Sequence, residues 1–390
     1  MDANANAVSI LQSLIRCPSV TPHEGGALDY LQNLLAAAGF RCWRLPFSEA
    51  GTPDVDNLFA MIGDGAPHLC FAGHTDVVPP GDEAAWTYPP FGGEIHDGAV
   101  WGRGAADMKG GVACFLAAAL GFLRKGELKR GAISFLITGD EEGPAVNGTK
   151  KVLEWMTANG HRPDHCLLGE PSNAHEIGEA IKIGRRGSFC ATLTVHGVQG
   201  HVAYPEFFAN PLTGLIAALA ALKAEPVDAG SEHFAPSNFE VTSIDTGNPA
   251  VNVVPARAVA KLNIRFNDLQ TRETMTAWMR ERIAPALGPG LRYDLEPTNF
   301  ADNFYTEPGP WVTMLVDAVR QQTGRTPELS THGGASDGRF IKDFMPVVEF
   351  GLCNATIHKV DERAPLEDLR RVTAIYRRFL ERYFTQAPGA

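Results

Sequence analysis

Short apolar runs alternate with longer stretches of helical periodicity over the first 170 residues of the chain. Four apolar runs predict buried strands, at 58–62, 69–72, 132–137 and 164–168. Three stretches predict helices, at 27–38, 109–125 and 146–159. In the first of these, Leu28, Leu31 and Leu35 fall on one stripe, and Gly39 follows as a C-terminal signal. Such alternation predicts an α/β fold with a mostly parallel mixed sheet and helices on its faces.

The order of predicted strands and helices changes in the middle of the chain, and the strand–helix alternation then resumes. Strands are expected at 189–196, 239–244, 259–266 and 291–295, with helices at 211–222 and 271–283. That order is β-α-β-β-α-β, the pattern of a ferredoxin-like α+β module. Helices at 311–322 and 365–383 and a strand at 346–350 then resume the α/β style. We therefore expect residues 1–186 and 300–390 to form one domain, interrupted by a second domain over 187–299.

Composition and charge exclude several partners. The chain has 34 Lys and Arg against 45 Asp and Glu, a net charge of −11, which opposes binding to a phosphate backbone. The longest apolar stretch, 111–123, is shorter than the roughly 18 residues needed to span a bilayer. Seven scattered cysteines without a C-x-x-C pair are typical of reduced thiols. We expect a cytoplasmic protein with neither a nucleic-acid nor a membrane partner.

His74 and Asp76 follow the apolar strand 69–72. Residues two apart on an extended chain project to the same side, so one could bind a metal while the other orients the imidazole. A histidine and an aspartate that merely satisfy each other in a loop would look the same. Further along, Glu141 and Glu142 follow the strand 132–137, where carboxylates repel each other unless they are solvated or neutralised by a cation.

Three more candidates stand near the ends of predicted elements. Asp107 precedes the helix at 109–125, in the place where the third glycine of a dinucleotide-binding fingerprint would stand, so that fingerprint fails. On position alone Asp107 is a helix cap. Glu170 follows the strand 164–168, and His358 follows the strand 346–350. Each of these alone is more often structural than functional.

Taken together, these positions indicate a metal centre. The ends of the predicted elements supply two histidines and several carboxylates, namely His74, Asp76, Asp107, Glu141, Glu142, Glu170 and His358. Such donors suit zinc or another borderline divalent ion, and no cysteine is placed to replace them. More acids than one zinc ion needs, with one able to bridge, favour two metal ions. In open α/β sheets, ligands bind at the carboxyl ends of the strands.

The motifs around these residues resemble the di-zinc amidohydrolases of the M20 peptidase group. The resemblance rests on His-Thr-Asp-Val-Val-Pro, Gly-Arg-Gly-Ala-Ala-Asp-Met-Lys-Gly, Asp-Glu-Glu and Gly-Glu-Pro-Ser, in that order. Four further segments resemble the desuccinylase branch of that group, at 184–188, 195–205, 336–340 and 356–359. The resemblance covers nearly the whole chain. It implies a zinc-peptidase-like catalytic domain interrupted by a lid and dimerisation domain, and hence a homodimer.

The resemblance also implies a set of metal ligands. His74 and Glu170 would hold one zinc ion, and Glu142 and His358 would hold the other. Asp107 would bridge the two ions. Co²⁺ or Mn²⁺ could substitute for zinc at such a site.

The implied reaction is amide hydrolysis in lysine and diaminopimelate biosynthesis. N-succinyl-L,L-2,6-diaminopimelate and water would give succinate and L,L-2,6-diaminopimelate. Glu141 would be the general base for a water held between the zinc ions, and would pass its proton to the leaving amine. Asp76 would orient His74, and His201 would reach the active site of the partner across the dimer and help to stabilise the oxyanion.

Substrate contacts are implied at six positions: Arg185, Ser188, Tyr204, Asn252, Arg265 and Asn354. An arginine fork binds a carboxylate in bidentate fashion, which suits a substrate with several carboxylates. Without the resemblance, Arg265 would be read as part of a solvated strand face. The chain departs from the family pattern at His332 and Ala335, where relatives carry hydroxyl side chains, so a substrate hydrogen bond could be lost there.

Two other functions remain open from the sequence. One is a sister activity on the same scaffold, such as N-acetylornithine deacetylase or another M20 acyl-amino-acid hydrolase. The other is a non-catalytic metal-binding or peptide-binding relative. An intact Glu141 beside a complete ligand set argues against the second, since a binding protein needs no base.

Overall fold

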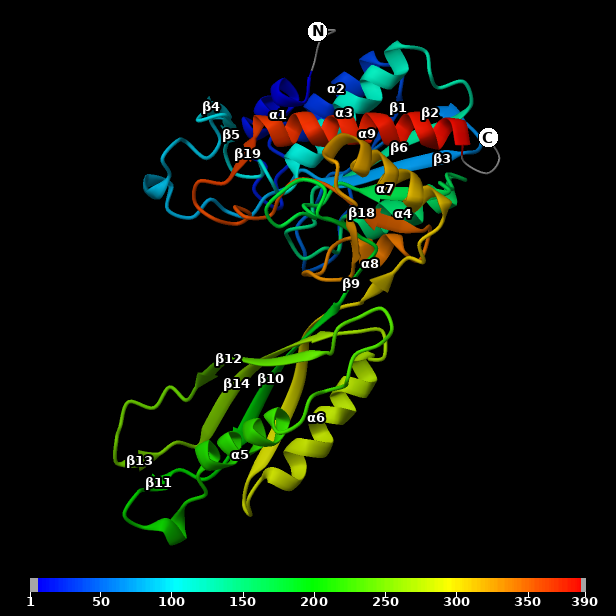
Figure 1. The fold of residues 1–390 in the computed structure, drawn as a ribbon. Coiled ribbons are helices and arrows are strands. Elements are labelled where there is room, and N and C mark those ends of the chain that lie inside the picture. Colours follow the sequence, from blue (N-terminus) through cyan, green and yellow to red (C-terminus); the bar gives the residue numbers. More distant parts are fainter. Residues whose placement is uncertain (1–5, 387–390) are drawn as a thin grey trace. The chain divides into compact units, whose positions relative to one another are not determined.

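A computed structural model describes residues 6–386 of the chain, and these divide into two compact units. The first comprises residues up to 183, 306–330 and those from 336 onward. The second comprises 184–305 together with 331–335. Within residues 6–386, none of the helices combines the length and apolarity needed to cross a membrane. Figure 1 shows the course of the chain through both units.

An eight-stranded mixed sheet forms the centre of the first unit. Its strand order is β1 (Arg41–Arg44), β2 (Leu58–Asp64), β6 (Gly131–Thr138), β3 (His68–His74), β7 (His165–Leu168), β18 (Val347–Glu349), β8 (Ala180–Lys182) and β17 (Glu328–Ser330). The four central strands β6, β3, β7 and β18 run parallel to one another. The expected mostly parallel mixed sheet is therefore confirmed. Because parallel strands end at the same edge, the segments that follow β3, β6, β7 and β18 meet there.

Helices enclose this sheet, as the alternating pattern predicted. They are α1 (Ala7–Ile15), α2 (Ala27–Ala37), α3 (Lys109–Arg124), α4 (Thr149–Ala158), α7 (Pro310–Thr323), α8 (Gly338–Ile341) and α9 (Leu366–Gln386). Figure 1 shows α1, α3 and α9 together, and these three helices pack on one another. The rings of Phe71 on β3 and Phe115 on α3 stack with centroids 4.2 Å apart. This packing fixes the start of α3, and with it Asp107, against the end of β3.

Three short strands that the periodicity did not indicate form a small separate sheet in the first unit. In it, β5 (Ala99–Trp101) pairs with β4 (Glu94–His96) and with β19 (Arg363–Pro365). Runs of three residues are too short for a hydrophobic pattern to reveal. The pairing places the segment before β19 beside the segment after β5, although more than 250 residues separate them in the sequence.

The second unit is a four-stranded antiparallel sheet with two helices. Its strand order is β12 (Asn238–Asp245), β14 (Arg257–Phe266), β10 (Gly187–His196) and β15 (Arg292–Ala301), with helices α5 (Pro211–Lys223) and α6 (Arg272–Ala286). Burial alternates strictly along β10, whose Phe189 and Leu193 lie in the core. The chain order is β-α-β-β-α-β, so the expected ferredoxin-like module is confirmed. Two short strand pairs flank the sheet, β9 (Gly184–Arg185) with β16 (Phe304–Tyr305) and β11 (Gly200–His201) with β13 (Val253–Val254).

His68, at the start of β3, makes the stability of the first unit depend on pH. Burial lowers its pKa from 6.5 to about 4, against the opposing charge of Asp164, and its Nε2 lies 2.9 Å from Ser134 Oγ. The unfolded chain therefore binds a proton between pH 6.5 and 4 that the folded chain does not. From pH 7 to 4.5 the free energy of unfolding should fall by about 2 kcal/mol through this residue alone. Urea unfolding of metal-free protein should show that His68→Gln loses about that much less than the unsubstituted chain; equal losses would contradict the assignment.

Candidate metal centre and active site

His74 is the last residue of β3, and its buried ring is held in one orientation. Its Nδ1 donates to the backbone carbonyl of Asp76 at 2.9 Å and lies 3.6 Å from that residue's carboxylate. Because Nδ1 carries the proton in this hydrogen bond, a neutral ring presents an unprotonated Nε2 on its other side. That is the form of histidine that binds a metal ion.

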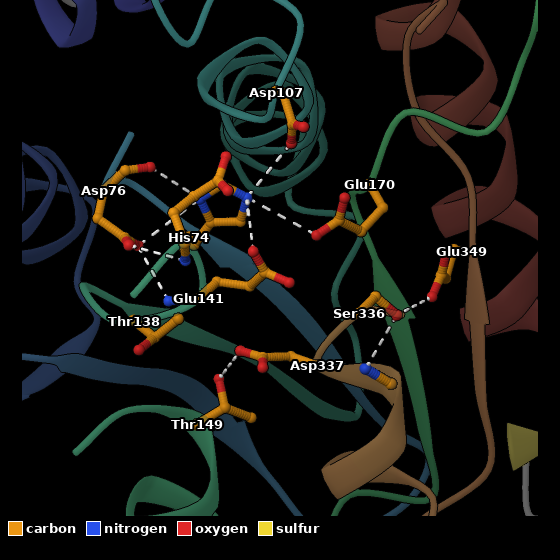
Figure 2. A network of polar contacts seen from close by, with 12 residues as sticks. His74, Asp76, Asp107, Thr138, Glu141, Thr149, Glu170, Ser336, Asp337 and Glu349 are labelled. Carbon is orange, nitrogen blue, oxygen red and sulfur yellow. Dashed lines mark hydrogen bonds and ion pairs between the residues drawn. The ribbon is translucent and has the colours of Figure 1, made fainter. Parts of the chain in front are cut away.

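Asp76 holds the next loop as well. Its carboxylate accepts hydrogen bonds from the backbone N–H groups of Glu141 (3.3 Å) and Glu142 (3.0 Å). Figure 2 shows the Asp76 side chain between His74 and the backbone at Glu141. Sequence reasoning gave Asp76 the single task of orienting His74. In the structure its carbonyl makes the hydrogen bond to His74, while its carboxylate anchors the two glutamates that follow β6.

Three carboxylates converge on Nε2 of His74. The distances from that nitrogen are 3.3 Å to Asp107 Oδ1, 3.7 Å to Glu170 Oε1 and 4.0 Å to Glu141 Oε2. Glu141 follows β6, Glu170 follows β7, and Asp107 precedes α3. Their convergence is visible in Figure 2. Parallel pairing of β3 with β6 and β7 brings these residues to one edge of the sheet.

A second histidine faces the other oxygen of Asp107. Nε2 of His358 lies 2.8 Å from Glu142 Oε1 and 3.4 Å from Asp107 Oδ2. Asp107 thus directs Oδ1 toward His74 and Oδ2 toward His358, which is the arrangement that a carboxylate bridging two cations requires.

Two sets of donors are close enough to hold a metal ion. Potential ligand atoms of His74, Asp107 and Glu142 lie within 4.8 Å of one another, and so do those of His74, Glu141 and Glu170. The second set includes Glu141, the expected general base. Proximity alone therefore allows Glu141 to be a ligand as well as a base, and the two roles need an experiment to separate them.

The pKa values of the acids and histidines at this site are shifted, because many ionisable groups lie close together and most of them are buried. Burial, then the neighbouring carboxylates with Glu170 foremost, raise the pKa of Glu141 well above its ordinary value, while His74 opposes the rise. Burial also raises the pKa of Asp76 to about 6, against the lowering effect of His74 and the two backbone N–H groups. Hydrogen bonds to Asp107 and Glu142 raise the pKa of His358 to about 10.

Burial opposes ionisation of Asp107 too, but its contacts with His358 and His74 hold its pKa below the ordinary value. Glu141 and Glu170, by contrast, oppose each other's ionisation in this buried place, and a bound cation would relieve that repulsion.

The residues present fit a divalent metal ion. His74 Nε2 and Asp107 Oδ1 are both buried and lie 3.3 Å apart, and neither makes a contact with hydrogen-bond geometry among residues 6–386. A buried polar atom without a partner is costly, and a cation between the two atoms would satisfy both. Imidazole nitrogens and carboxylate oxygens are the donors that zinc and similar ions take in catalytic sites.

The expected substrate residues of the second unit, with the expected catalytic residue His201, form two separate groups. Ser188 and Arg265 lie opposite each other on β10 and β14, and Arg185 on β9 is buried, with its Nη1 donating to the carbonyl of Gly334 at 3.1 Å. These three residues occupy one end of the sheet; we call them the near-end group. Asn354 belongs to the first unit, where its N–H donates to the carbonyl of Asn173 at 2.9 Å.

His201, Tyr204 and Asn252 lie beyond the opposite end of the same sheet; we call them the far-end group. The rings of His201 and Tyr204 have centroids 5.6 Å apart, and the Asn252 carbonyl accepts from Val202 N–H at 3.1 Å. Strand β10 separates the two groups, and its eight steps from Ser188 to His196 span about 26 Å at 3.3 Å per residue. In Figure 1, β11 and β13 lie away from β9 within this unit. One small substrate cannot touch both groups of the same chain.

Sequence reasoning assigned no role to several buried residues around the site. Asp337 accepts from the Thr149 hydroxyl at 2.6 Å, contributes to the raised pKa of Glu141 and lies near it in Figure 2. Arg103 and Glu362 form a buried ion pair of 2.8 Å. Asp337 and Arg103 belong to segments already noted for their motifs, whereas Thr149 and Glu362 do not. Their contacts could not be read from the chain, because they join positions that are far apart in it.

Comparisons with known proteins agree with this geometry. The model of peptidase family M20/M25/M40 matches residues 70–382. The chain is 57% identical to a succinyl-diaminopimelate desuccinylase from Methylorubrum populi over 386 residues, covering 98% of this chain and all of that protein. A succinyl-diaminopimelate desuccinylase from Rhodospirillum centenum is also 57% identical, over 380 residues that cover 97% of this chain and 98% of that one.

Solved structures show the same fold at much lower identity. An M20 family metallo-carboxypeptidase from Sulfolobus solfataricus superposes with a TM-score of 0.78 at 18% identity, covering 98% of this chain and all of that one. A tripeptidase from Staphylococcus aureus gives 0.77 at 19%, covering 99% of this chain and all of that one. At such identities the likeness establishes the fold alone.

Proposed function

The chain belongs to peptidase family M20/M25/M40, and from this premise we propose that it hydrolyses N-succinyl-L,L-2,6-diaminopimelate to succinate and L,L-2,6-diaminopimelate. The observation that carries the proposal is the 57% identity to desuccinylases over almost the whole length of both chains. The geometry around His74 supports it, because an acid-rich, histidine-containing site suits metal-assisted amide hydrolysis. All seven cysteines are free thiols, which supports placing the enzyme in the cytoplasm.

We further propose that the site holds two zinc ions, which Co²⁺ or Mn²⁺ could replace. His74 and Glu170 would hold one ion, and Glu142 and His358 the other, with Asp107 between them. When bound, such ions polarise an amide carbonyl and make a water molecule more acidic. The orientations of His74 and Asp107 support this assignment, since each directs a buried, unsatisfied atom into the same space.

The proposed base is Glu141, whose side chain is largely buried but keeps 16% of its surface exposed. Its carboxylate would accept a proton from the attacking water and deliver it to the nitrogen of the departing amine. Asp76 supports that task, because its hydrogen bond to the Glu141 N–H fixes the backbone from which the carboxylate extends. The same residue fixes the ring of His74, so one aspartate positions both the base and a metal ligand.

Carboxylates of the substrate require cationic partners. We propose that Arg185 and Arg265 bind them and that Ser188 forms a hydrogen bond to the substrate; Asn354, in the first unit, is proposed as a separate substrate contact. Arg265 lies opposite Ser188 in the strand register, so the two side chains share one face of the sheet. A guanidinium fork fixes the orientation of a carboxylate as well as its charge, which suits selection of a substrate by its acidic ends.

The far-end group supports a homodimer formed through the second unit. His201, Tyr204 and Asn252 lie too far from the near-end group to meet the same substrate, so we propose that they serve the active site of a partner subunit. Sedimentation should then give roughly twice the 42.0 kDa chain mass. A monomer at micromolar concentration would argue against His201 acting in the partner's site.

Hydrolysis assays on zinc-loaded protein test the proposed reaction. N-succinyl-L,L-diaminopimelate and N-acetylornithine should be offered side by side, each with and without a chelator. Chelator-sensitive turnover of the succinyl compound alone is the expected result. Turnover of N-acetylornithine instead would keep the metal-dependent chemistry and overturn the substrate, with His332 and Ala335 as the first positions to exchange. Activity on neither compound would contradict the proposal and favour a different acyl amino acid or a binding role.

A further inference from the structure

We propose that Arg103 and Glu362 are positioning residues, which hold His358 in place to bind the second metal ion. This inference rests on the proposed metal centre, in which Glu142 and His358 hold that ion. Neither residue forms a hydrogen bond or an ion pair with His74, and neither belongs to the expected ligand set. Their effect would be exerted through the backbone of the two segments that carry Asp107 and His358.

Arg103 ties three segments of the site together. Its guanidinium is buried and lies over the ring of Trp86, 5.2 Å from the ring centroid. One nitrogen, Nη1, donates to the carbonyl of Lys359, next to His358, at 3.1 Å. The other, Nη2, donates to the carbonyl of Pro79, in the segment after His74 and Asp76, at 3.4 Å. A lysine could not reach acceptors in these separate directions, since it lacks the planar fork.

Glu362 completes the connection to Asp107. Its fully buried carboxylate uses Oε2 to accept from Arg103 Nη1 at 2.8 Å. The other oxygen, Oε1, accepts from the backbone N–H groups of Ala106 (2.9 Å) and Asp107 (3.1 Å). The backbone carbonyl of Glu362 also accepts from Gly102 N–H at 2.9 Å. The Glu362 side chain therefore fixes the backbone of Asp107, the proposed bridging ligand. It also fixes the guanidinium of Arg103, which holds the segment that carries His358.

His358 needs such support more than the other proposed ligands do. His74 ends a central strand, whereas His358 lies in a turn with its side chain 48% exposed. Its φ is 58°, and that of Asp361 is 62°, in the left-handed region that residues other than glycine seldom adopt. A backbone of this kind persists only where its surroundings hold it. The contacts of Arg103 with the Lys359 carbonyl and of Glu362 with Gly102 hold the chain directly after His358, on both sides of Asp361.

Zinc titration of metal-free protein in competition with a chromogenic chelator tests the inference. Arg103→Lys keeps the charge but loses the fork, and Glu362→Gln keeps an oxygen for the two N–H groups but presents a donor to Arg103. In both variants the dissociation constant of the second Zn²⁺ should rise about 10- to 100-fold, the usual range for residues that support a metal ligand. The first Zn²⁺ should bind nearly as tightly as in the unsubstituted protein.

Arg377→Lys is the matched control. Arg377 also pairs with a glutamate, Glu127, and lies over an aromatic ring, Phe122, but between α9 and α3 away from the site. Both dissociation constants should be unchanged in this variant.

Three outcomes would overturn the inference: unchanged affinity for both Zn²⁺ ions, an equal loss of affinity for both, or loss of folding in both test variants. Each would mean that Arg103 and Glu362 have no selective effect on the second ion. An unsubstituted protein that bound fewer than two Zn²⁺ would contradict the proposed metal centre itself, so the two failures can be told apart.

Discussion

Glu141→Ala should lower turnover of N-succinyl-L,L-diaminopimelate by about 10²- to 10⁴-fold, the range that general acid–base catalysis contributes, while the protein keeps its zinc. The carboxylate lies 4.0 Å from His74 Nε2, next to the space that the two histidines and Asp107 surround. From there it can reach both the attacking water and the departing amine. Removing it leaves the proposed ligands in place but removes the group that moves the proton.

Metal analysis of the same variant separates the two roles that proximity allows. Zinc content equal to that of the unsubstituted protein, with turnover lost, would support a base. Zinc content reduced by one ion would show that Glu141 is a ligand, as its grouping with His74 and Glu170 permits. Glu154→Ala, an exposed acid on α4, is the control and should change neither quantity. Near-normal turnover of Glu141→Ala would exclude it as the base.

Asp107→Ala should reduce the bound zinc from two ions to one or none and abolish activity. Its two oxygens face different histidines, at 3.3 Å from His74 and 3.4 Å from His358. No other carboxylate among residues 6–386 contacts both of those rings within 4.0 Å. Without this bridge, His358 and Glu142 would have to hold the second ion alone.

Asp107→Asn sharpens the experiment, because it keeps the shape of the side chain but leaves one acceptor oxygen in place of two. We expect this variant to lose the second ion while it retains part of the first. Zinc measured after dialysis against metal-free buffer provides the comparison. Two ions bound to either variant would contradict the bridging role. Circular dichroism of the metal-free variants would confirm that a loss of zinc does not reflect loss of the fold.

The hydrophobic pattern determined most of the fold. Buried strands such as 69–72 and 132–137 read as short apolar runs, and the helix at 27–38 showed a clear stripe, because burial imposes the same period wherever an element packs. The change to a β-α-β-β-α-β order near residue 188 identified the antiparallel module for the same reason. Short strands such as β5 and β19 were missed, since three residues carry no period and pair only because the rest of the fold brings them together.

Sequence alone also determined which side chains could gather at one edge of the sheet. His74, Glu141 and Glu170 follow apolar runs, and the ends of parallel strands meet. Tertiary structure decided the rest. It directed the two oxygens of Asp107 toward different histidines and paired the carbonyl of Asp76 with the ring of His74. It also placed Glu141 close enough to His74 and Glu170 to be a metal ligand. These details depend on distances of a few tenths of an ångström, which no linear pattern records.

The largest gap between sequence and structure concerns contacts between distant positions. Arg103 and Glu362 are 259 residues apart, and nothing local to either predicts that they meet in a buried ion pair. The separation of His201 from Ser188 in turn follows from the length of β10 and the register of its sheet. From a single sequence one can read the side-chain types and the hydrophobic periodicity of each element. Which elements become neighbours is decided by the packing of the whole chain, where burial, charge pairing and backbone hydrogen bonds must be satisfied together.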